Sequence, residues 1–274
     1  MSYPFDPGYH DEPFRTLCSE FPSSEGYPQS RFRVEWGPIF HRGRLDGSAK
    51  ILVIGQDPAQ HEAIVRRILV GEAGRRVQGF LSKLGITKSY VMINTFLYSV
   101  YGSVRVENRR NVQLVGYRNR WLDALLLNSK IEAVVALGIH ATEAWQMWKD
   151  TPNGKESDIA FCTITHPTFP ESFSKGDRTK LIEITKKMLQ NWNKGLEVLI
   201  DAISHPDDDE KKQLVLYGEI FTDGEKPEIP SIDYPAGLPA WMRELDGWAR
   251  RVGKTDSKKR GNITITIPKQ YLPT

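Results

Sequence analysis

The sequence of 274 residues contains only two cysteines, Cys18 and Cys162. Two thiols are too few for an all-cysteine zinc site or an iron–sulfur cluster within one chain. Such low cysteine use is typical of proteins in a reducing compartment. We therefore expect a cytoplasmic location and no cluster of this kind.

Other common signals are also missing. The sequence has no apolar run of the roughly 18 residues that a membrane-spanning helix needs, so we expect no contact with a membrane. Residues 1–20 show no basic segment followed by an apolar block, which argues against a signal peptide. No G-x-G-x-x-G follows the first strand-like run, and this disfavours a nucleotide-binding Rossmann protein.

The composition that remains is that of a globular protein. Hydrophobic residues make up 39% of the chain and charged residues 26%, a balance unlike that of a disordered chain. The net charge of +3 permits binding to nucleic acid but does not diagnose it.

Short apolar runs alternate with longer amphipathic segments. The runs are KILVIG (50–55), YVMINT (90–95), EAVVALG (132–138) and IAFCTIT (159–165). Each is apolar at odd and even positions alike, as in the parallel strands of a sheet covered on both faces. The segments between and after them have apolar residues at helical spacing: 61–85, 118–128, 140–148 and 177–195. In the first of these, Gly71 and Gly74 predict a loop before the helix begins.

This alternation predicts the fold class α/β: a three-layer sandwich whose central four-stranded, mainly parallel sheet is flanked by helices. Residues 1–30, with five prolines, read as an irregular N-terminal arm, and residues 31–195 as the catalytic domain. Residues 196–274 begin with a charged run at 204–213 and read as a C-terminal extension packed on the core.

Polar residues stand where the predicted strands end. Gln56 and Asp57 follow the first strand, Asn94 ends the second, and His166 follows the fourth. Ligands of open α/β sheets bind at the carboxyl ends of the strands, so these side chains should meet at one edge. An acid can activate water, an amide can pair with a base edge, and an imidazole can stabilise an oxygen that gains charge. The set suits hydrolysis next to an amide-rich heterocycle.

The motifs GQDP (55–58) and HP (166–167), together with Asn94, resemble those of the uracil-DNA glycosylase superfamily. The resemblance covers roughly residues 30–195, and stretches such as VVALGIHATEAW resemble the iron–sulfur-bearing branches, although the cluster cysteines are absent. It implies that Asp57 positions water and balances a sugar cation, and that the Gln56 backbone contacts a uracil oxygen. It also implies that Asn94 reads the pyrimidine edge and that His166 stabilises the departing uracil.

The sequence departs from the best-known branch around the base pocket. That branch has Tyr and then His after GQDP, whereas this chain has Ala59 and Gln60, with His61 one place later. Glu62 aligns with a Glu of the iron–sulfur-bearing branch and is our first candidate for the wall that rejects thymine. Leu69 stands where the family has a stacking Phe. Either Leu69 makes a weaker contact or another aromatic, such as Phe80, stacks on the base.

DNA contacts are expected from two segments. Thr168, Phe169 and Pro170 follow the HP motif, where the family carries a wedge into the DNA stack. Arg109 and Arg110 lie in an arginine-rich stretch suited to phosphates.

Each of these residues also has a structural interpretation. Asp57 is a plausible helix N-cap, Asn94 a loop tie, and His166 with Pro167 a turn. His61 reads equally well as a solvated residue at a helix start, Phe169 as a core aromatic, and the arginines as a solvated face.

We expect a monomeric, monofunctional enzyme that flips uracil out of single- or double-stranded DNA and hydrolyses its N-glycosidic bond without metal or cofactor. Such excision begins base excision repair. No Lys is placed to form a Schiff base, so lyase activity is not expected. The alternatives are a same-fold glycosylase for another deaminated or mismatched base, and a module that binds uracil-DNA without cutting it.

Overall fold

The structure is a computed structural model that describes residues 9–22, 25–127, 129–204, 206–207, 213–244 and 247–272. Parts of the predicted arm (1–8 and 23–24) and most of the predicted charged run (205 and 208–212) lie outside the described residues.

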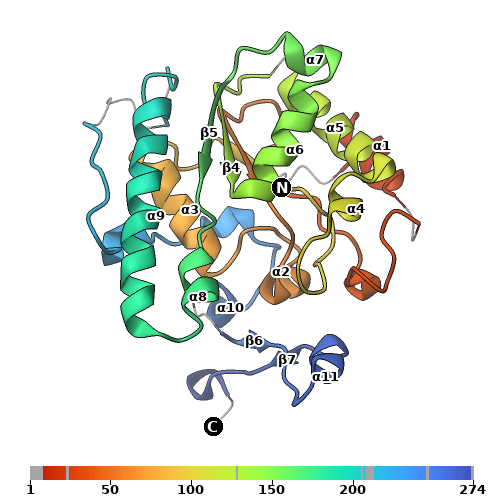
Figure 1. Cartoon of the computed structure of the whole chain (residues 1–274), viewed down its shortest axis with the longest axis vertical. Helices are drawn as coiled ribbons and strands as arrows, with labels where there is room; N and C mark the ends of the chain where they lie inside the picture. Colours follow the sequence, from red (N-terminus) through yellow and green to blue (C-terminus); the bar gives the residue numbers. More distant parts are fainter. Residues whose placement is uncertain are drawn as a thin grey trace.

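A five-stranded sheet forms the centre of the molecule (Figure 1). Its strands are β1 (His41–Gly43), β2 (Ile51–Gly55), β3 (Tyr90–Asn94), β4 (Ala133–Leu137) and β5 (Ala160–Ile164). They lie in the order β1-β3-β2-β4-β5; β2, β3, β4 and β5 are parallel, and β1 is antiparallel to β3. The mainly parallel sheet flanked by helices confirms the predicted α/β class.

The prediction of four strands was wrong, because β1 is a fifth. The strand is short and polar, so no apolar run marks it in the sequence. Its His41 and Arg42 are nevertheless 1% and 0% exposed. His41 Nδ1 is 2.7 Å from the hydroxyl of Tyr9, and Arg42 meets Asp233 of the C-terminal extension. Partners from distant segments make this polar edge strand possible.

Helices cover both faces of the sheet, as Figure 1 shows. One face carries α3 (Glu72–Lys83) and α9 (Arg178–Leu199), and the other carries α1 (Phe14–Ser19), α5 (Val112–Leu126) and α6 (Ile139–Lys149). Along β2, Ile51 and Val53 join the first apolar cluster, and Leu52 and Ile54 the second. Burial on both faces explains why the strand sequences lack alternation.

Short elements lie at the ends of the strands. They are η1 (Val34–Trp36), α2 (Gln60–Val65), α4 (Val106–Arg109), α7 (Pro152–Lys155) and α8 (Phe169–Ser174). The loop predicted from Gly71 and Gly74 is shorter than expected. Gly71 precedes α3 with φ 77°, but Gly74 lies inside the helix. A Cβ at Gly74 would stand 1.6 Å from the carbonyl oxygen of Leu69, so close packing, and not a loop, requires this glycine.

The described part of the C-terminal extension contains η2 (Asp223–Glu225), η3 (Ser231–Asp233), α10 (Ala240–Glu244), β6 (Ala249–Arg250), α11 (Asp256–Arg260), β7 (Thr264–Ile265) and η4 (Lys269–Tyr271). It packs closely on the core: a Cβ at Gly79 of α3 would stand 2.0 Å from the carbonyl oxygen of Glu225. In Figure 1, β6, β7 and α11 lie beyond α2 and α8, on the side of the sheet where β2 and β5 end.

A buried polar cluster joins the extension to the sheet. Asp233 accepts a 2.5 Å hydrogen bond from the hydroxyl of Tyr90, and its carboxylate lies 3.5 Å from Arg42 Nη1. Both side chains of the ion pair are 0% exposed. Burial raises the pKa of Asp233, and the charge of Arg42 opposes that shift. Among the described residues, no helix combines the length and apolar character needed to cross a bilayer.

Replacing one partner of this buried pair should destabilise the protein. We expect Asp233→Ala to lower the free energy of unfolding by about 3–5 kcal/mol, because it leaves the Arg42 charge buried without its partner. Urea unfolding measures the effect. Asp223→Ala, which removes an exposed carboxylate of the same extension, is the matched control. Equal loss in both variants would contradict the role assigned to the pair.

Candidate active site at the carboxyl end of the sheet

A pocket of about 520 Å³ opens where β2 and β5 end. The residues that line it include Gln56, Asp57, Ala59, His166, Thr168 and Phe169. A second pocket of about 540 Å³ lies beside it and shares Gln56, His166 and Phe169 with the first. The shared residues make the two pockets parts of one groove along the strand ends. The fold therefore brings together the predicted acid, one predicted amide and the predicted imidazole.

Asp57 is held by two hydrogen bonds. Its Oδ2 accepts from the backbone N–H of Val100 at 2.8 Å, and its Oδ1 accepts from Gln56 Nε2 at 2.7 Å. Burial raises the pKa of Asp57 to about 6; the bonds from Val100 and Gln56 and the charge of Arg33 oppose that shift. Asp57 does not cap a helix, because α2 begins at Gln60 with Ala59 at its N-cap. The carboxylate is thus a half-buried, oriented acceptor at the pocket.

The loop after β3 holds the backbone N–H of Val100 in position to donate to Asp57. Thr95 donates from its backbone N–H and from its hydroxyl to the carbonyl of Gly55, each at 2.9 Å. Phe96 N–H donates to the carbonyl of Gln56 at 2.9 Å, and the Ser99 hydroxyl donates to the carbonyl of Pro58. These bonds lock the two strand-end loops together, so the Asp57 carboxylate has a fixed place.

Helix α9 holds the end of β5 and thereby positions His166. Asn191 Oδ1 accepts from the backbone N–H of Thr165 at 2.7 Å and from its hydroxyl at 3.0 Å. Trp192 Nε1 donates to the carbonyl of Thr165 at 2.9 Å. These bonds fix the residue next to His166.

His166 is held as a neutral donor. Its Nδ1 accepts from the backbone N–H of Thr168 at 3.3 Å, which leaves the proton on Nε2. Burial lowers the pKa of His166 to about 4. The imidazole is therefore uncharged near neutral pH and offers one N–H to a ligand.

Helix α8 follows the HP motif and projects apolar side chains. Phe169 is 41% exposed and Phe173 54%, and their rings lie 5.4 Å apart. Pro170 is buried. Arg76, only 8% exposed, pairs with Glu171 at 2.7 Å and secures the helix to α3. Phe169 is therefore an exposed aromatic at the groove, whereas Pro170, which follows it, is buried.

Asn94 lies on the face of the sheet that α3 and α9 cover. It has the same parity as Tyr90 and Met92, which belong to the cluster on that face. A Cβ at Gly55 would stand 2.2 Å from Asn94 Oδ1, so the side chain lies directly over that glycine. Asn94 is 6% exposed, and its Nδ2 has no partner among the described residues. The amide does not line the pocket of Asp57.

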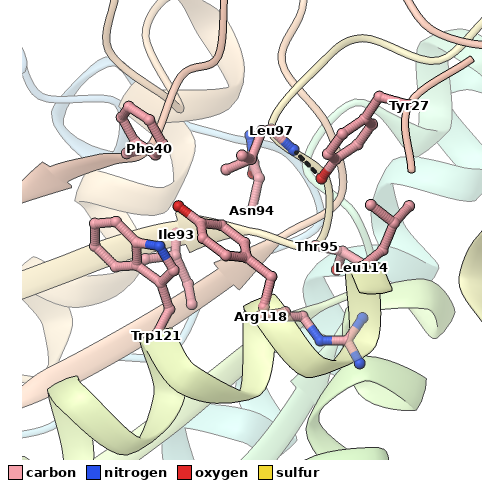
Figure 2. A pocket seen from close by; sticks show the side chains of 10 residues that line it. Tyr27, Phe40, Ile93, Asn94, Thr95, Leu97, Leu114, Arg118 and Trp121 are labelled. Atoms are coloured by element: carbon pink, nitrogen blue, oxygen red, sulfur yellow. Dashed lines mark hydrogen bonds between the residues drawn. The ribbon is translucent and has the colours of Figure 1, made fainter. Parts of the chain in front are cut away.

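A separate small cavity lies beside the end of β3 (Figure 2). Its lining residues include Asn94, Tyr27, Arg118 and Trp121, and its volume is about 10 Å³. Tyr27 accepts a 3.1 Å hydrogen bond from the backbone N–H of Leu97, drawn as a dashed line in Figure 2. The cavity has room for about one water molecule and is too small for a base.

The residues after GQDP have different surroundings. Ala59 is exposed and lines the pocket. Glu62 is 5% exposed, and its carboxylate accepts from the backbone N–H groups of Ala59 and Leu69. His61 packs edge-to-face on Trp248 of the extension, with ring centroids 4.8 Å apart. Glu62 therefore caps α2 and supports the next loop, and His61 contacts the extension.

The two stacking candidates are core residues. Leu69 is 5% exposed and adopts φ 51°, a left-handed conformation unusual for Leu. Phe80 is 0% exposed and packs edge-to-face on Trp192 at 5.7 Å. Neither lines the groove that Asp57 and His166 share. Both belong to the apolar cluster on the face of the sheet that α3 and α9 cover.

The arginine-rich stretch lies near the start of α6. Arg109 is 20% exposed and pairs with Glu143, while Arg110 is 69% exposed and lies 3.6 Å from the same carboxylate. Arg109 Nη1 is also 3.5 Å from Nδ1 of His140, which lines the second pocket. Arg110 is the more available charge of the two.

Sequence reasoning missed several contributors to the site. The N–H of Val100 is a backbone group, which no motif reveals. Asn191 could have been found, because it is a polar residue next to the buried Met188, Leu189 and Trp192 of α9. Arg33, at the start of the predicted catalytic domain, and Arg251, in the C-terminal extension, also line the pocket.

The described residues contain no group of three or more His, Cys, Asp or Glu arranged to hold a metal ion. The fold and the site define an α/β protein with an acid and a neutral imidazole in one pocket at the carboxyl ends of a parallel sheet, where open α/β sheets bind their ligands. Residues 42–195 match the family model of the uracil DNA glycosylase superfamily. The match covers more than half of the chain, which therefore belongs to this superfamily of DNA glycosylases, whose substrate is DNA. Among curated proteins, none matches this chain.

The two buried acids should titrate at unusually high pH. We expect the Asp57 carboxyl to titrate near pH 6 and that of Glu62 near pH 7, in carbon-13 NMR of labelled protein. Asp57→Asn should remove the first titration, and Glu62→Gln the second. Because folding raises both pKa values, the stability that these groups contribute is greatest at low pH and declines as pH rises from about 4 to about 7. Titration of both groups below pH 4.5 would contradict the burial described here.

The two arginines of α4 and its C-cap should differ in DNA binding. We expect Arg110→Ala to lower the slope of log affinity against log salt by about 0.9 for duplex DNA, the value for one phosphate contact. Arg109→Ala should change the slope less, because Glu143 already pairs with Arg109. Binding titrations at several salt concentrations measure both slopes, and an unchanged slope for Arg110→Ala would show that this arginine only solvates the surface.

Proposed function

We propose that the chain is a monofunctional DNA glycosylase that excises uracil by water-mediated hydrolysis of the N-glycosidic bond. The observation that carries the proposal is the meeting of Asp57 and His166 in one pocket, with one group ionised and the other neutral near pH 7. Hydrolysis through a sugar oxocarbenium ion needs an anion beside the sugar and a donor beside the leaving base.

The groups divide the reaction between them. As the bond to the base breaks, the Asp57 carboxylate faces the growing positive charge of the sugar and orients the water that adds to it. His166 donates its Nε2–H to the uracil oxygen that gains negative charge. The bonds from Val100 and Gln56 hold the Asp57 carboxylate in place throughout, so it needs no reorganisation during the reaction.

Asn94 is the proposed reader of the base edge. Its buried Nδ2, unpartnered among the described residues, is a donor that a uracil carbonyl would satisfy. A buried donor without a partner costs about 1–3 kcal/mol, which a correctly placed base would recover and a wrong edge would not. The base must then reach the face of the sheet that Leu69 and Phe80 line.

Phe169 is the proposed wedge. A flipped base leaves a gap in the stack, and an exposed apolar side chain can occupy it. Phe169 has the exposure and the place beside the groove that this role needs, with Phe173 packed against it. We further propose that the protein acts as a monomer in the cytoplasm, where it starts base excision repair.

A second candidate function keeps the fold and the chemistry but widens the range of bases. It is favoured by the surroundings of Ala59, which offers only a methyl group to the pocket, while Glu62 is engaged by two backbone N–H groups. A pocket that merely accommodates one extra methyl group discriminates by about 1–3 kcal/mol. Such a pocket would release a mispaired thymine or a 5-substituted uracil as well as uracil.

Asp57→Asn should lower the single-turnover rate of base release by roughly 10²–10⁴-fold, the range for one positioned acid–base group. The substrates are duplexes that carry uracil, mispaired thymine, hypoxanthine or xanthine at one site. Release of uracil alone supports the first candidate, and release of several bases supports the second. Asp201→Asn, which changes an exposed carboxylate of the same type, is the control and should keep the parent's rate. Equal rates in parent and Asp57→Asn would remove Asp57 from the mechanism.

A further inference from the structure

Two arginines from outside the family match line the Asp57 pocket. Arg33 precedes β1, and Arg251 follows β6 in the C-terminal extension. The family match, residues 42–195, contains neither of them. We call Arg33 and Arg251 the arginine pair.

Arg33 is fixed to the loop that holds Asp57. Its backbone N–H donates to the carbonyl of Ser99 at 2.9 Å, and the preceding Phe32 forms an antiparallel bridge with Val100. The guanidinium of Arg33 lies over the ring of Tyr101, 4.3 Å from its centroid. The segment that supplies the N–H to Asp57 therefore also positions Arg33.

Arg251 is fixed by the fold of the extension. Val252 N–H donates to Asn262 Oδ1 at 3.2 Å, and Asn262 Nδ2 donates to the carbonyl of Val252 at 2.8 Å. Arg251 Nη1 itself donates to the carbonyl of Asn262 at 3.4 Å. Ala249, two residues before Arg251, is 0% exposed and belongs to the same apolar cluster as Val65 of α2. The contact between β6 and α2 thus places Arg251 at the pocket.

The two guanidinium groups of the arginine pair lie close enough for the charge of one to affect the other. Burial lowers the pKa of Arg251, and the charge of Arg33 lowers it further, while Glu35 opposes the shift. Arg251 Nη2 is buried without a partner among the described residues. Asp57 already accepts from Val100 and Gln56. Two guanidinium groups at one pocket, of which Arg251 has a buried N–H without a described partner, favour a bound anion there.

We propose that the arginine pair binds a backbone phosphate of the DNA strand whose nucleotide enters the pocket, so that the C-terminal extension is part of the substrate-binding surface. The inference rests on the proposed function, because a nucleotide that reaches Asp57 carries its flanking phosphates to the pocket opening. A guanidinium presents planar N–H groups that match phosphate oxygens, which a single lysine does not.

The test is DNA binding in an Asp57→Asn background, where the base should stay attached to its sugar. Arg33→Ala and Arg251→Ala are compared with Arg250→Ala, whose exposed side chain donates to the carbonyl of Gly247 instead. We expect each change in the arginine pair to weaken binding about tenfold to a hundredfold and to lower the salt slope by about 0.9 for duplex DNA. Arg250→Ala should match the background in both measurements.

Neutral methylphosphonates then locate the contact. In a series of duplexes, each phosphate near the uridine is replaced in turn. One replacement should weaken binding by the background protein but have little effect on Arg33→Ala or Arg251→Ala. Unchanged Kd and salt slope in both alanine variants would overturn the proposal. The proposal would also be overturned if the alanine changes left Kd unchanged but lowered the rate of base release when Asp57 is present, since the arginine pair would then act on the base.

Two controls distinguish a loss of DNA binding from a loss of folding and from a failure of the proposed function. Urea unfolding checks each variant, and if Arg251→Ala fails to fold, Arg251→Lys replaces it. The lysine variant should keep the salt slope and lose part of the affinity, and parental affinity would count against a guanidinium site. Binding is read without base release. A protein that releases no base but shows the methylphosphonate pattern would contradict the proposed function and support the arginine pair.

Discussion

The hydrogen bond from the Val100 N–H to the Asp57 carboxylate is the interaction on which the rest of the site depends. A carboxylate in a sparsely hydrated pocket needs a donor that does not move, and a backbone N–H in a fixed loop meets that need. The loop is fixed because Thr95 and Phe96 bond to the carbonyls at the end of β2. The same loop carries the bridge to Phe32 that brings Arg33 to the pocket. One short segment therefore orients the acid and sets the charge around it.

Burial shifts the pKa values of Asp57 and His166 in opposite directions, and both shifts suit one reaction. It raises the pKa of the acid to about 6 and lowers the pKa of the imidazole to about 4, since it disfavours the charged form of each. Above about pH 6 the Asp57 carboxyl is mainly ionised, while the His166 imidazole is uncharged. A negative charge and a neutral donor can thus coexist in one pocket, and the proposed glycosylase mechanism needs both. The superfamily match and the meeting of Asp57 and His166 in one pocket both support the proposed mechanism.

The sequence predicted what local patterns encode. The short apolar runs predicted the parallel strands, and the polar residues after them marked the edge where Asp57 and His166 meet. It could not predict β1, because His41 and Arg42 are buried only through partners such as Asp233, far along the chain. For the same reason it could not place Arg251, which reaches the pocket through the contact of β6 with α2. It also could not show that the Glu62 carboxylate accepts from the backbone N–H groups of Ala59 and Leu69, since the second lies in the loop after α2, where Leu69 adopts a left-handed conformation.

The central claim is that an ionised Asp57 faces positive charge at the sugar while a neutral His166 serves the leaving base. The pH dependence of single-turnover uracil release from DNA tests it most directly. The rate should rise with pH, reach half of its maximum near pH 6, and stay level through neutral pH, because Asp57 ionises there and His166 is already neutral. A rate that falls as the pH rises through 6, or one independent of pH between 5 and 7, would contradict the account.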